Sequence, residues 1–302
     1  MKRVITMNAK SKVNILAIAT VILWASAFPF SKVAMEHFSP NSLGCLRITA
    51  ASIFLILLGI FSRLHLPRKK DIYKFFLSGA LGFTLYMLTF NVGIRTLTSA
   101  TSSIIMAMTP VMTAVGALFI YREKIPAIGW ISIGIEFIGI LVLTLWDGVL
   151  SINVGILWTL STAILFCGYN LYQRKLLSQG YTPLEITIFS ITAGAILFLP
   201  FLPNGIHEMS RAPLSHILVV IYLGVFPNAI AAFTWGKALL IAKKTSDVTN
   251  FMFVTPLLAT IMGFVVLRES PSAGTIAGGI IILVGLRLFQ KKQKEAVKKQ
   301  SE

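Results

Sequence analysis

The residues best suited to chemistry in this sequence are polar and aromatic side chains that interrupt long apolar segments. Burying a hydroxyl, amide or indole group in such a segment costs free energy unless the group faces a partner or a cavity. Aromatic walls with a few hydrogen-bonding groups bind small amphipathic solutes. We therefore predict that these side chains line a binding cavity, and hydrogen bonding between helices is the alternative role for each. The candidates are Trp24, Ser26, Ser31, Thr101, Ser102, Met106, Thr109, Tyr169, Asn170, Tyr172, Asn228, Trp235, Asn250, Phe253 and Thr255.

One acidic residue, Glu136, stands in the middle of an apolar segment, where a carboxylate costs about 2.5–3.5 kcal/mol on insertion scales. On a helix it shares a face with Gly129, Ser132 and Gly139, so we expect it to face a closely packed helix rather than lipid. Two roles are open. It is either a proton-coupling carboxylate or a protonated acid that is hydrogen-bonded across a helix contact.

Two prolines and two basic residues also lie in or near apolar segments. Pro110 and Pro256 each free a backbone carbonyl, and we expect them to kink their helices rather than end them. They are predicted hinges, with static kinks that shape the cavity as the alternative. Lys32 and Arg47 are expected to extend their side chains to the membrane interface. Mutual pairing, or binding of an anionic group, is the alternative for these two.

The composition around these residues is that of a membrane protein. Of 302 residues, 56% are hydrophobic and 13% are charged, whereas a soluble domain carries about 25% charged residues. This excludes a disordered chain and an ordinary soluble enzyme. The net charge of +16 comes from basic residues between apolar runs, so it indicates membrane topology and a lipid bilayer partner rather than nucleic acid. Cys45 and Cys167 lie inside apolar runs, which excludes a disulfide framework.

Ten apolar segments are long enough to cross a bilayer as helices, which needs about 20 residues. The first is too long for a signal-peptide core and is expected to remain as a helix. The sequence thus predicts an all-α integral membrane protein with ten transmembrane helices. The segments are 14–35, 41–61, 72–94, 99–121, 127–145, 154–176, 183–202, 215–236, 246–267 and 272–288.

The distribution of basic residues predicts the orientation of the chain. With the N-terminus in the cytoplasm and ten alternating helices, 22 of the 27 Lys and Arg residues fall on the cytoplasmic side. Cytoplasmic segments carry this excess in membrane proteins. We therefore expect both termini in the cytoplasm and a multi-pass location in the cell (plasma) membrane.

The two halves of the chain repeat each other. A shift of 146 residues places Thr109-Pro110 on Thr255-Pro256 and Arg122-Glu123 on Arg268-Glu269. This predicts two five-helix units, 1–147 and 148–290, followed by a basic cytoplasmic tail, 291–302. Because five is odd, the second unit enters the membrane from the opposite side. Inverted repeats of this kind are typical of secondary transporters, with the binding site near the midplane.

Motifs for catalysis are absent from the sequence. It has no G-x-x-x-x-G-K-[S/T] phosphate loop, no H-E-x-x-H zinc helix and no G-x-S-x-G elbow. We expect no catalytic residue, no cofactor and no metal site, and hence not an enzyme.

The motifs themselves are similar to those of a known family. The first two spans read W-A-S-A-F-P-F-S-K at 24–32, then Pro40 and Arg47, and the fourth reads S-A-T-S-S-I-I-M-A-M-T-P at 99–110, followed by Glu123. Over residues 12–290 the chain resembles the EamA-type family of the drug/metabolite transporter superfamily. The resemblance implies ten helices around a central cavity, with spans one, three, four, six, eight and nine near it. Phe166 and Ser190 depart from strict symmetry, since they stand where the first repeat has Trp24 and Arg47.

The resemblance also implies a function. Members of this kind are mostly exporters of amino acids, other small metabolites or drugs, which points to alternating access around one central site. An importer or exchanger is the nearest alternative. A membrane-embedded receptor or assembly factor is the alternative from another class, which the short outer connection at 203–214 disfavours. The small-molecule substrate is not specified, and a monomer and a homodimer are both compatible with the sequence.

Overall fold

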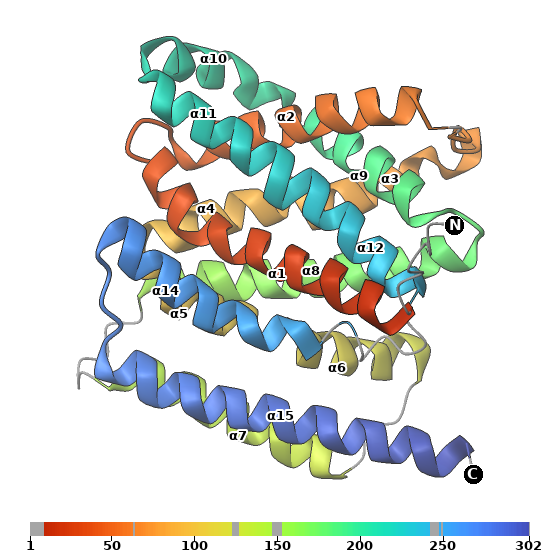
Figure 1. Cartoon of the computed structure of the whole chain (residues 1–302), viewed down its shortest axis with the longest axis vertical. Helices are drawn as coiled ribbons and strands as arrows, with labels where there is room; N and C mark the ends of the chain where they lie inside the picture. Colours follow the sequence, from red (N-terminus) through yellow and green to blue (C-terminus); the bar gives the residue numbers. More distant parts are fainter. Residues whose placement is uncertain are drawn as a thin grey trace, which may run out of the picture.

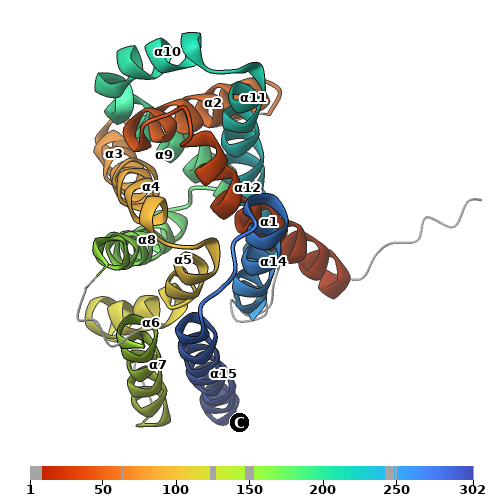
Figure 2. The same cartoon turned by 90° about the vertical axis from the view of Figure 1, so that its left-hand side faces the viewer.

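The computed structural model describes residues 9–62, 64–122, 127–146, 153–241, 248 and 250–301, and every regular element in them is helical. The helices lie side by side in a tall stack, with α7 and α15 at one end and α10 at the other (Figures 1 and 2). The first half contains α1 (Ala9–Ala34), α2 (Pro40–Ile60), η1 (Lys69–Asp71), α3 (Ile72–Gly79), η2 (Ala80–Thr84), α4 (Leu85–Thr96), α5 (Ser99–Met106), α6 (Thr109–Tyr121) and α7 (Ala127–Leu145). The second half contains α8 (Val154–Ser178), α9 (Pro183–Phe198), η3 (Leu199–Phe201), α10 (Leu202–Arg211), α11 (Leu214–Leu223), η4 (Gly224–Ile230), α12 (Ala231–Ile241), η5 (Asn250–Val254), α14 (Thr255–Leu267) and α15 (Ala273–Ser301).

Seven helical stretches in the described part of the chain are long and apolar enough to cross a membrane. Three shorter apolar helices coincide with the remaining predicted spans. This is the helix content of a multi-pass membrane protein, and the count of ten spans stays a prediction. The long stretches are Ser11–Ala34, Pro40–Ile60, Lys69–Thr96, Ser99–Tyr121, Val154–Ser178, Pro183–Arg211 and Leu214–Ala238, and the short ones are Ala127–Gly139, Thr255–Leu267 and Ala273–Gly285.

Corresponding spans of the two halves depart from α-helical geometry at corresponding places. The π-helical segments η2 and η4 interrupt the third and eighth spans. The fourth span breaks at Ala107 and Met108, between α5 and α6, and in the ninth the 3-10 segment η5 directly precedes α14. Arg122 and Arg268, which are 146 residues apart, both adopt a left-handed backbone with φ of 55° and 57°. The duplication thus extends to local backbone detail.

The structure corrects the expected role of the two prolines in helix continuity. Pro110 and Pro256 are each the second residue of a new helix, α6 and α14, rather than kinks inside a continuous one. The first turn of a helix has no intrahelical partner for its backbone N–H groups, so a proline is accommodated there without a lost hydrogen bond. The breaks therefore lie just before the prolines.

The last span of each half packs against the other in a reciprocal way. A Cβ at Gly139 of α7 would lie 2.6 Å from Ile282 of α15, and a Cβ at Gly285 of α15 would lie 2.8 Å from Glu136 of α7. The 146-residue shift places Gly139 on Gly285 and Glu136 on Ile282, so the repeat converts one contact into the other. Because the higher number on one helix meets the lower number on the other, α7 and α15 are antiparallel.

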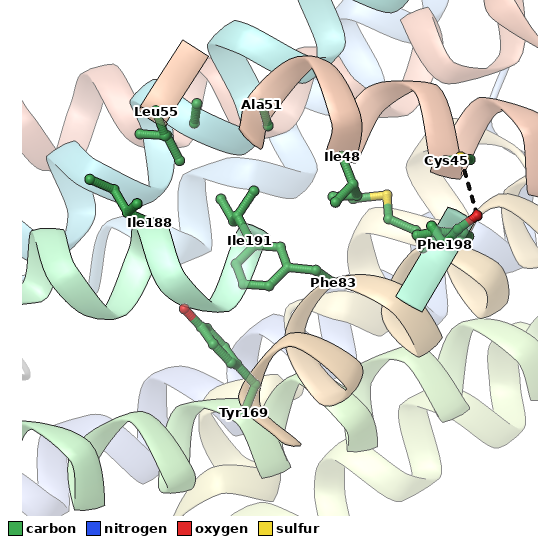
Figure 3. Packing of buried hydrophobic residues seen from close by; sticks show 11 residues of the cluster. Cys45, Ile48, Ala51, Leu55, Phe83, Tyr169, Ile188, Ile191 and Phe198 are labelled. Carbon is green, nitrogen blue, oxygen red and sulfur yellow. Dashed lines mark hydrogen bonds between the residues drawn. The ribbon is translucent and has the colours of Figure 1, made fainter. Parts of the chain in front are cut away.

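A packed core joins the two halves near the other end of the stack. Residues of α2 interlock with residues of α9, and the thiol of Cys45 lies 3.4 Å from the carbonyl oxygen of Phe198 (Figure 3). Phe83 of η2 and Tyr169 of α8 form the edge of this cluster, with their ring centroids 5.3 Å apart. The core thereby fixes η2 against α8, and both elements take part in the site described next.

The connection expected at 203–214 is mostly helical, because α10 occupies Leu202–Arg211. Pro203 stands at the start of this helix, a position that suits proline.

Candidate functional site

A cavity of about 110 Å³ lies in the middle of the molecule, between helices of both halves. Its walls come from α1, α2, α4, α5, α8 and α12, from the start of α14 and from irregular segments. The lining residues are Trp24, Ala27, Phe28, Arg47, Gly82, Phe83, Tyr86, Met87, Phe90, Ser103, Met106, Ala107, Phe166, Tyr169, Asn170, Gln173, Pro227, Asn228, Ala232, Trp235, Met252 and Thr255.

The four irregular segments of the third, fourth, eighth and ninth spans all contribute to the wall. Gly82 belongs to η2, Asn228 to η4 and Met252 to η5, and Ala107 stands at the break between α5 and α6. π-Helical bulges and broken helices recur at functional sites because they leave backbone groups unpaired and allow local movement. The cavity is thus placed where both repeats are least regular.

Gly82 is required at its position by a close approach. A Cβ there would lie 2.3 Å from Cδ2 of Tyr169, so the tyrosine ring packs directly on the backbone of η2. Any larger residue would displace this ring from the wall of the cavity.

Aromatic rings form most of the apolar wall. Trp24 packs against Trp235, with centroids 4.9 Å apart, and edge-on against Phe166 at 6.3 Å. Tyr86 stacks on Phe90 at 5.7 Å. Such rings are rigid and present a large apolar surface, which suits the body of an amphipathic solute.

Arg47 supplies the charge in this wall. Its side chain is 1% exposed, Nη1 donates to Oγ of Ser31 at 2.7 Å, and Nη2 donates to Oδ1 of Asn228 at 3.2 Å. The expectation that Arg47 reaches the membrane interface is therefore wrong. The physical reason is tight packing of α2 on η4, where a Cβ at Gly224 would lie 2.6 Å from the backbone oxygen of Arg47, so the side chain is enclosed.

Lys32 is held by contacts at the end of its helix. Its ammonium group forms an ion pair with Glu269 and donates to the backbone oxygen of Leu97 at 2.9 Å. The other carboxylate oxygen of Glu269 accepts the backbone N–H of Ser99 at 2.7 Å. A carboxylate is stabilised at a helix N-terminus. Glu269 therefore connects the C-terminal end of α1 to the N-terminal end of α5.

Seven of the predicted cavity residues line the cavity, and six lie elsewhere. Ser26 bonds Tyr222 at 2.7 Å, Ser31 lies behind Arg47, and Thr101 bonds Thr275 at 3.1 Å. Ser102 is buried, and the hydroxyl of Thr109 donates to the backbone oxygen of Met106 across the break. Tyr172 packs in the cluster around Phe75. The side chains of Asn250 and Phe253 lie outside the described part of the structure. The seven that line it are Trp24, Met106, Tyr169, Asn170, Asn228, Trp235 and Thr255.

Glu136 lies away from the cavity, on α7 where it faces α15. It is fully buried, and neither carboxylate oxygen has a hydrogen-bond partner among the residues described. The expected close contact between α7 and a neighbouring helix is present, but among the described residues Glu136 makes no hydrogen bond across it. On the same interface a Cβ at Gly274 would lie 2.5 Å from Trp146, so this glycine packs within the chain.

Sequence reasoning missed several lining residues. Phe28, Tyr86 and Phe90 line the cavity. An aromatic residue in an apolar span can face either a cavity or lipid, and the sequence alone does not distinguish these two positions. Gln173 carried a usable signal, because it follows Asn170 by three residues and so shares its helix face. Within the residues described, no group of His, Cys, Asp and Glu is arranged to hold a metal ion.

Comparison with known proteins identifies the family. The model of the EamA-like transporter family matches twice, at residues 11–145 and 153–289. The chain belongs to the EamA-like transporter family. Both matches together cover most of the chain, and one lies in each half. EamA-like transporters are membrane proteins, and a small-molecule substrate and membrane lipids follow as partners of this chain.

Individual relatives agree with this assignment. The chain is 30% identical to the uncharacterized transporter YdfC of Bacillus subtilis, covering 87% of this chain and 86% of that protein. It is 27% identical to a probable terminal-alkyne amino-acid exporter of Streptantibioticus cattleyicolor, covering 91% and 92%. A crystal structure with 18% identity matches with a TM-score of 0.62 over 93% of this chain and 97% of the other, which shows a shared fold.

Proposed function

We propose that this EamA-like transporter exports amino acids or related amphipathic solutes by alternating access around the central cavity. The observation that carries the proposal is the wall of that cavity, which the irregular helical segments of both halves build together. Rocking of one half against the other would expose the cavity to each side of the membrane in turn. Pro110 and Pro256, at the two breaks, are the hinge candidates.

The proposed architecture is ten helices in two inverted five-helix repeats, 1–147 and 148–290, with the tail 291–302 and both termini in the cytoplasm. The reciprocal, antiparallel contact between α7 and α15 supports inversion. A two-fold axis that exchanges two antiparallel neighbours in this way crosses them at a right angle. For helices that span a bilayer, such an axis lies in the membrane plane, as in other inverted-repeat transporters.

The proposed direction of transport is out of the cell. The ion pair of Lys32 and Glu269 lies at the end of the molecule assigned to the outside, where it ties α1 to α5 and to the segment after α14. Gln173 and Met252 line the cavity near helix ends assigned to the cytoplasm. A state closed outside and lined toward the cytoplasm can load solute from within the cell, as export requires, although importers pass through the same state. The relative that is named as an exporter is what favours export here.

Efflux from cells tests the proposal. Cells that produce the protein in the plasma membrane are preloaded with labelled amino acids, nucleobases and cationic drugs, and the loss of each label is followed. We expect faster loss of one solute class, and Ala232→Phe, which fills the cavity wall on α12, abolishes it. Ala127→Phe, on the exposed start of α7, is the matched control and keeps it. Faster accumulation instead indicates import, and an effect that survives Ala232→Phe contradicts transport through this cavity.

A further inference from the structure

Arg47 is a buried charge without a counter-ion. The guanidinium cannot lose its proton in a protein, and an enclosed charge costs free energy unless an opposite charge offsets it. Among the ion pairs of the described residues none involves Arg47. Its two hydrogen-bond partners, Ser31 and Asn228, are neutral. A solute that carries a negative charge into the cavity would offset this cost.

Two donors remain unused beside this charge. Nε of Arg47 is buried without a hydrogen-bond partner, and so is Nδ2 of Asn228. Because a guanidinium can only donate hydrogen bonds, the amide oxygen of Asn228 must face Nη2 of Arg47. The NH2 group of Asn228 is then left without this partner. Both residues line the cavity. A carboxylate has two oxygens that accept such donors, and charge-assisted bonds of this kind are the stronger ones.

The rest of the wall is neutral. Arg47 is the one charged side chain among the residues found to line the cavity, and no Asp or Glu stands beside it there. An amine would meet no carboxylate in this wall and would be repelled by the guanidinium. An amino acid retains a carboxylate, and its ammonium group is compatible with the faces of Trp24 and Trp235.

We propose that Arg47 and Asn228 form a carboxylate-binding subsite, and that the solutes carried are small organic carboxylates with an apolar body, amino acids included. The inference rests on the proposed transport function for its physiological meaning, but the binding preference is measurable without transport. Ser31 and the close packing of α2 on η4 hold the guanidinium in place before the solute arrives. Such preorganisation lowers the cost of binding.

Equilibrium binding to the purified full chain in detergent tests the subsite. The probes share one aromatic body and differ in the polar group: 3-phenylpropionate, its neutral amide 3-phenylpropionamide, and 3-phenylpropylamine. We expect the carboxylate to bind at least about tenfold tighter than the amide, with the amine weakest. Equal affinities of carboxylate and amide, or a preference for the amine, overturn the proposal with the wild-type protein alone.

Variants assign the preference to these residues. Arg47→Gln is expected to bind carboxylate and amide equally, and Asn228→Ser to show a reduced preference. Arg95→Gln, at an exposed arginine near the end of α4, is the matched control and keeps the wild-type ratio. If Arg47→Gln does not fold, Arg47→Lys retains the charge without the fork, and we expect a partial loss. A wild-type ratio in every variant contradicts the assignment.

The binding and efflux experiments fail independently. If cells export a solute class but the purified protein shows no preference for the carboxylate, the subsite is refuted and the transport function stands. Carboxylate-selective binding without movement of any solute removes the transport function and leaves a ligand site.

Discussion

The junction of Lys32, Glu269 and Ser99 makes a quantitative prediction about the closed outer side. Glu269 accepts a charged donor from α1 and the first backbone N–H of α5, and the two ion-pair side chains are 23% and 14% exposed. A hydrogen bond to a charged group contributes about 1.5–3 kcal/mol. Glu269→Gln preserves the size of the side chain but removes the charge, so we expect a loss of about 2 kcal/mol after allowing for partial exposure.

This loss applies to the state in which the junction is formed. In alternating access the junction must separate when the outer side opens, so the substitution raises the population of the outward-open state relative to the closed one. About 2 kcal/mol corresponds to a shift of roughly thirtyfold, since each 1.4 kcal/mol is a factor of ten. The direction is toward greater exposure of the cavity to the outside.

Thiol labelling measures this exposure. Cys45 and Cys167, both buried, are replaced by alanine, and Ala27→Cys places a reporter on the cavity side of α1. We expect a membrane-impermeant maleimide added outside to label this reporter at least tenfold faster in the Glu269→Gln protein. Arg95→Gln, at an exposed arginine near the end of α4, is the control and leaves the rate unchanged. An unchanged rate with Glu269→Gln refutes the junction as an outer closure.

Three further substitutions follow from the packing. Gly82→Ala displaces the ring of Tyr169 and should weaken solute binding while lowering the free energy of unfolding by about 1–3 kcal/mol, and normal binding with normal melting contradicts the contact. Pro110→Ala and Pro256→Ala, tested separately, are expected to slow transport several-fold with binding retained, and unchanged rates remove the hinge role. Glu136→Gln should keep the pH dependence of transport, because the residue lies away from the cavity, whereas Glu136→Leu should raise thermal stability by replacing a buried acid without a partner by an apolar side chain. A lost pH dependence assigns proton coupling to Glu136 instead.

Hydropathy predicted where the helices lie because membrane insertion depends on local composition. The ranges 99–121 and 154–176 agree with described helices to within a few residues. It did not predict η2, η4 or the break before Pro110, since these depend on the packing of neighbouring helices rather than on local composition. The repeat in the sequence was nevertheless a sound guide, as the left-handed backbone of Arg122 and Arg268 illustrates.

The site was partly predictable for a related reason. A polar or aromatic residue within a span signals either a cavity or a helix contact, and the signal alone does not choose. Asn228 lines the cavity, whereas Ser26 bonds another helix. The burial of Arg47 depends on partners 16 and 181 residues away, and Lys32 pairs with a residue 237 positions away. Such pairings follow only from the assembled fold.

Exchange across a membrane tests the central claim most directly. Purified protein is reconstituted into vesicles loaded with an unlabelled amino acid from the class identified by efflux, and entry of the labelled form is followed. We predict entry well above that of protein-free vesicles, its loss in Ala232→Phe, and its retention in Ala127→Phe. Entry that is equal in the wild-type protein and Ala232→Phe, or no entry of any solute, contradicts alternating access through the cavity of the two repeats.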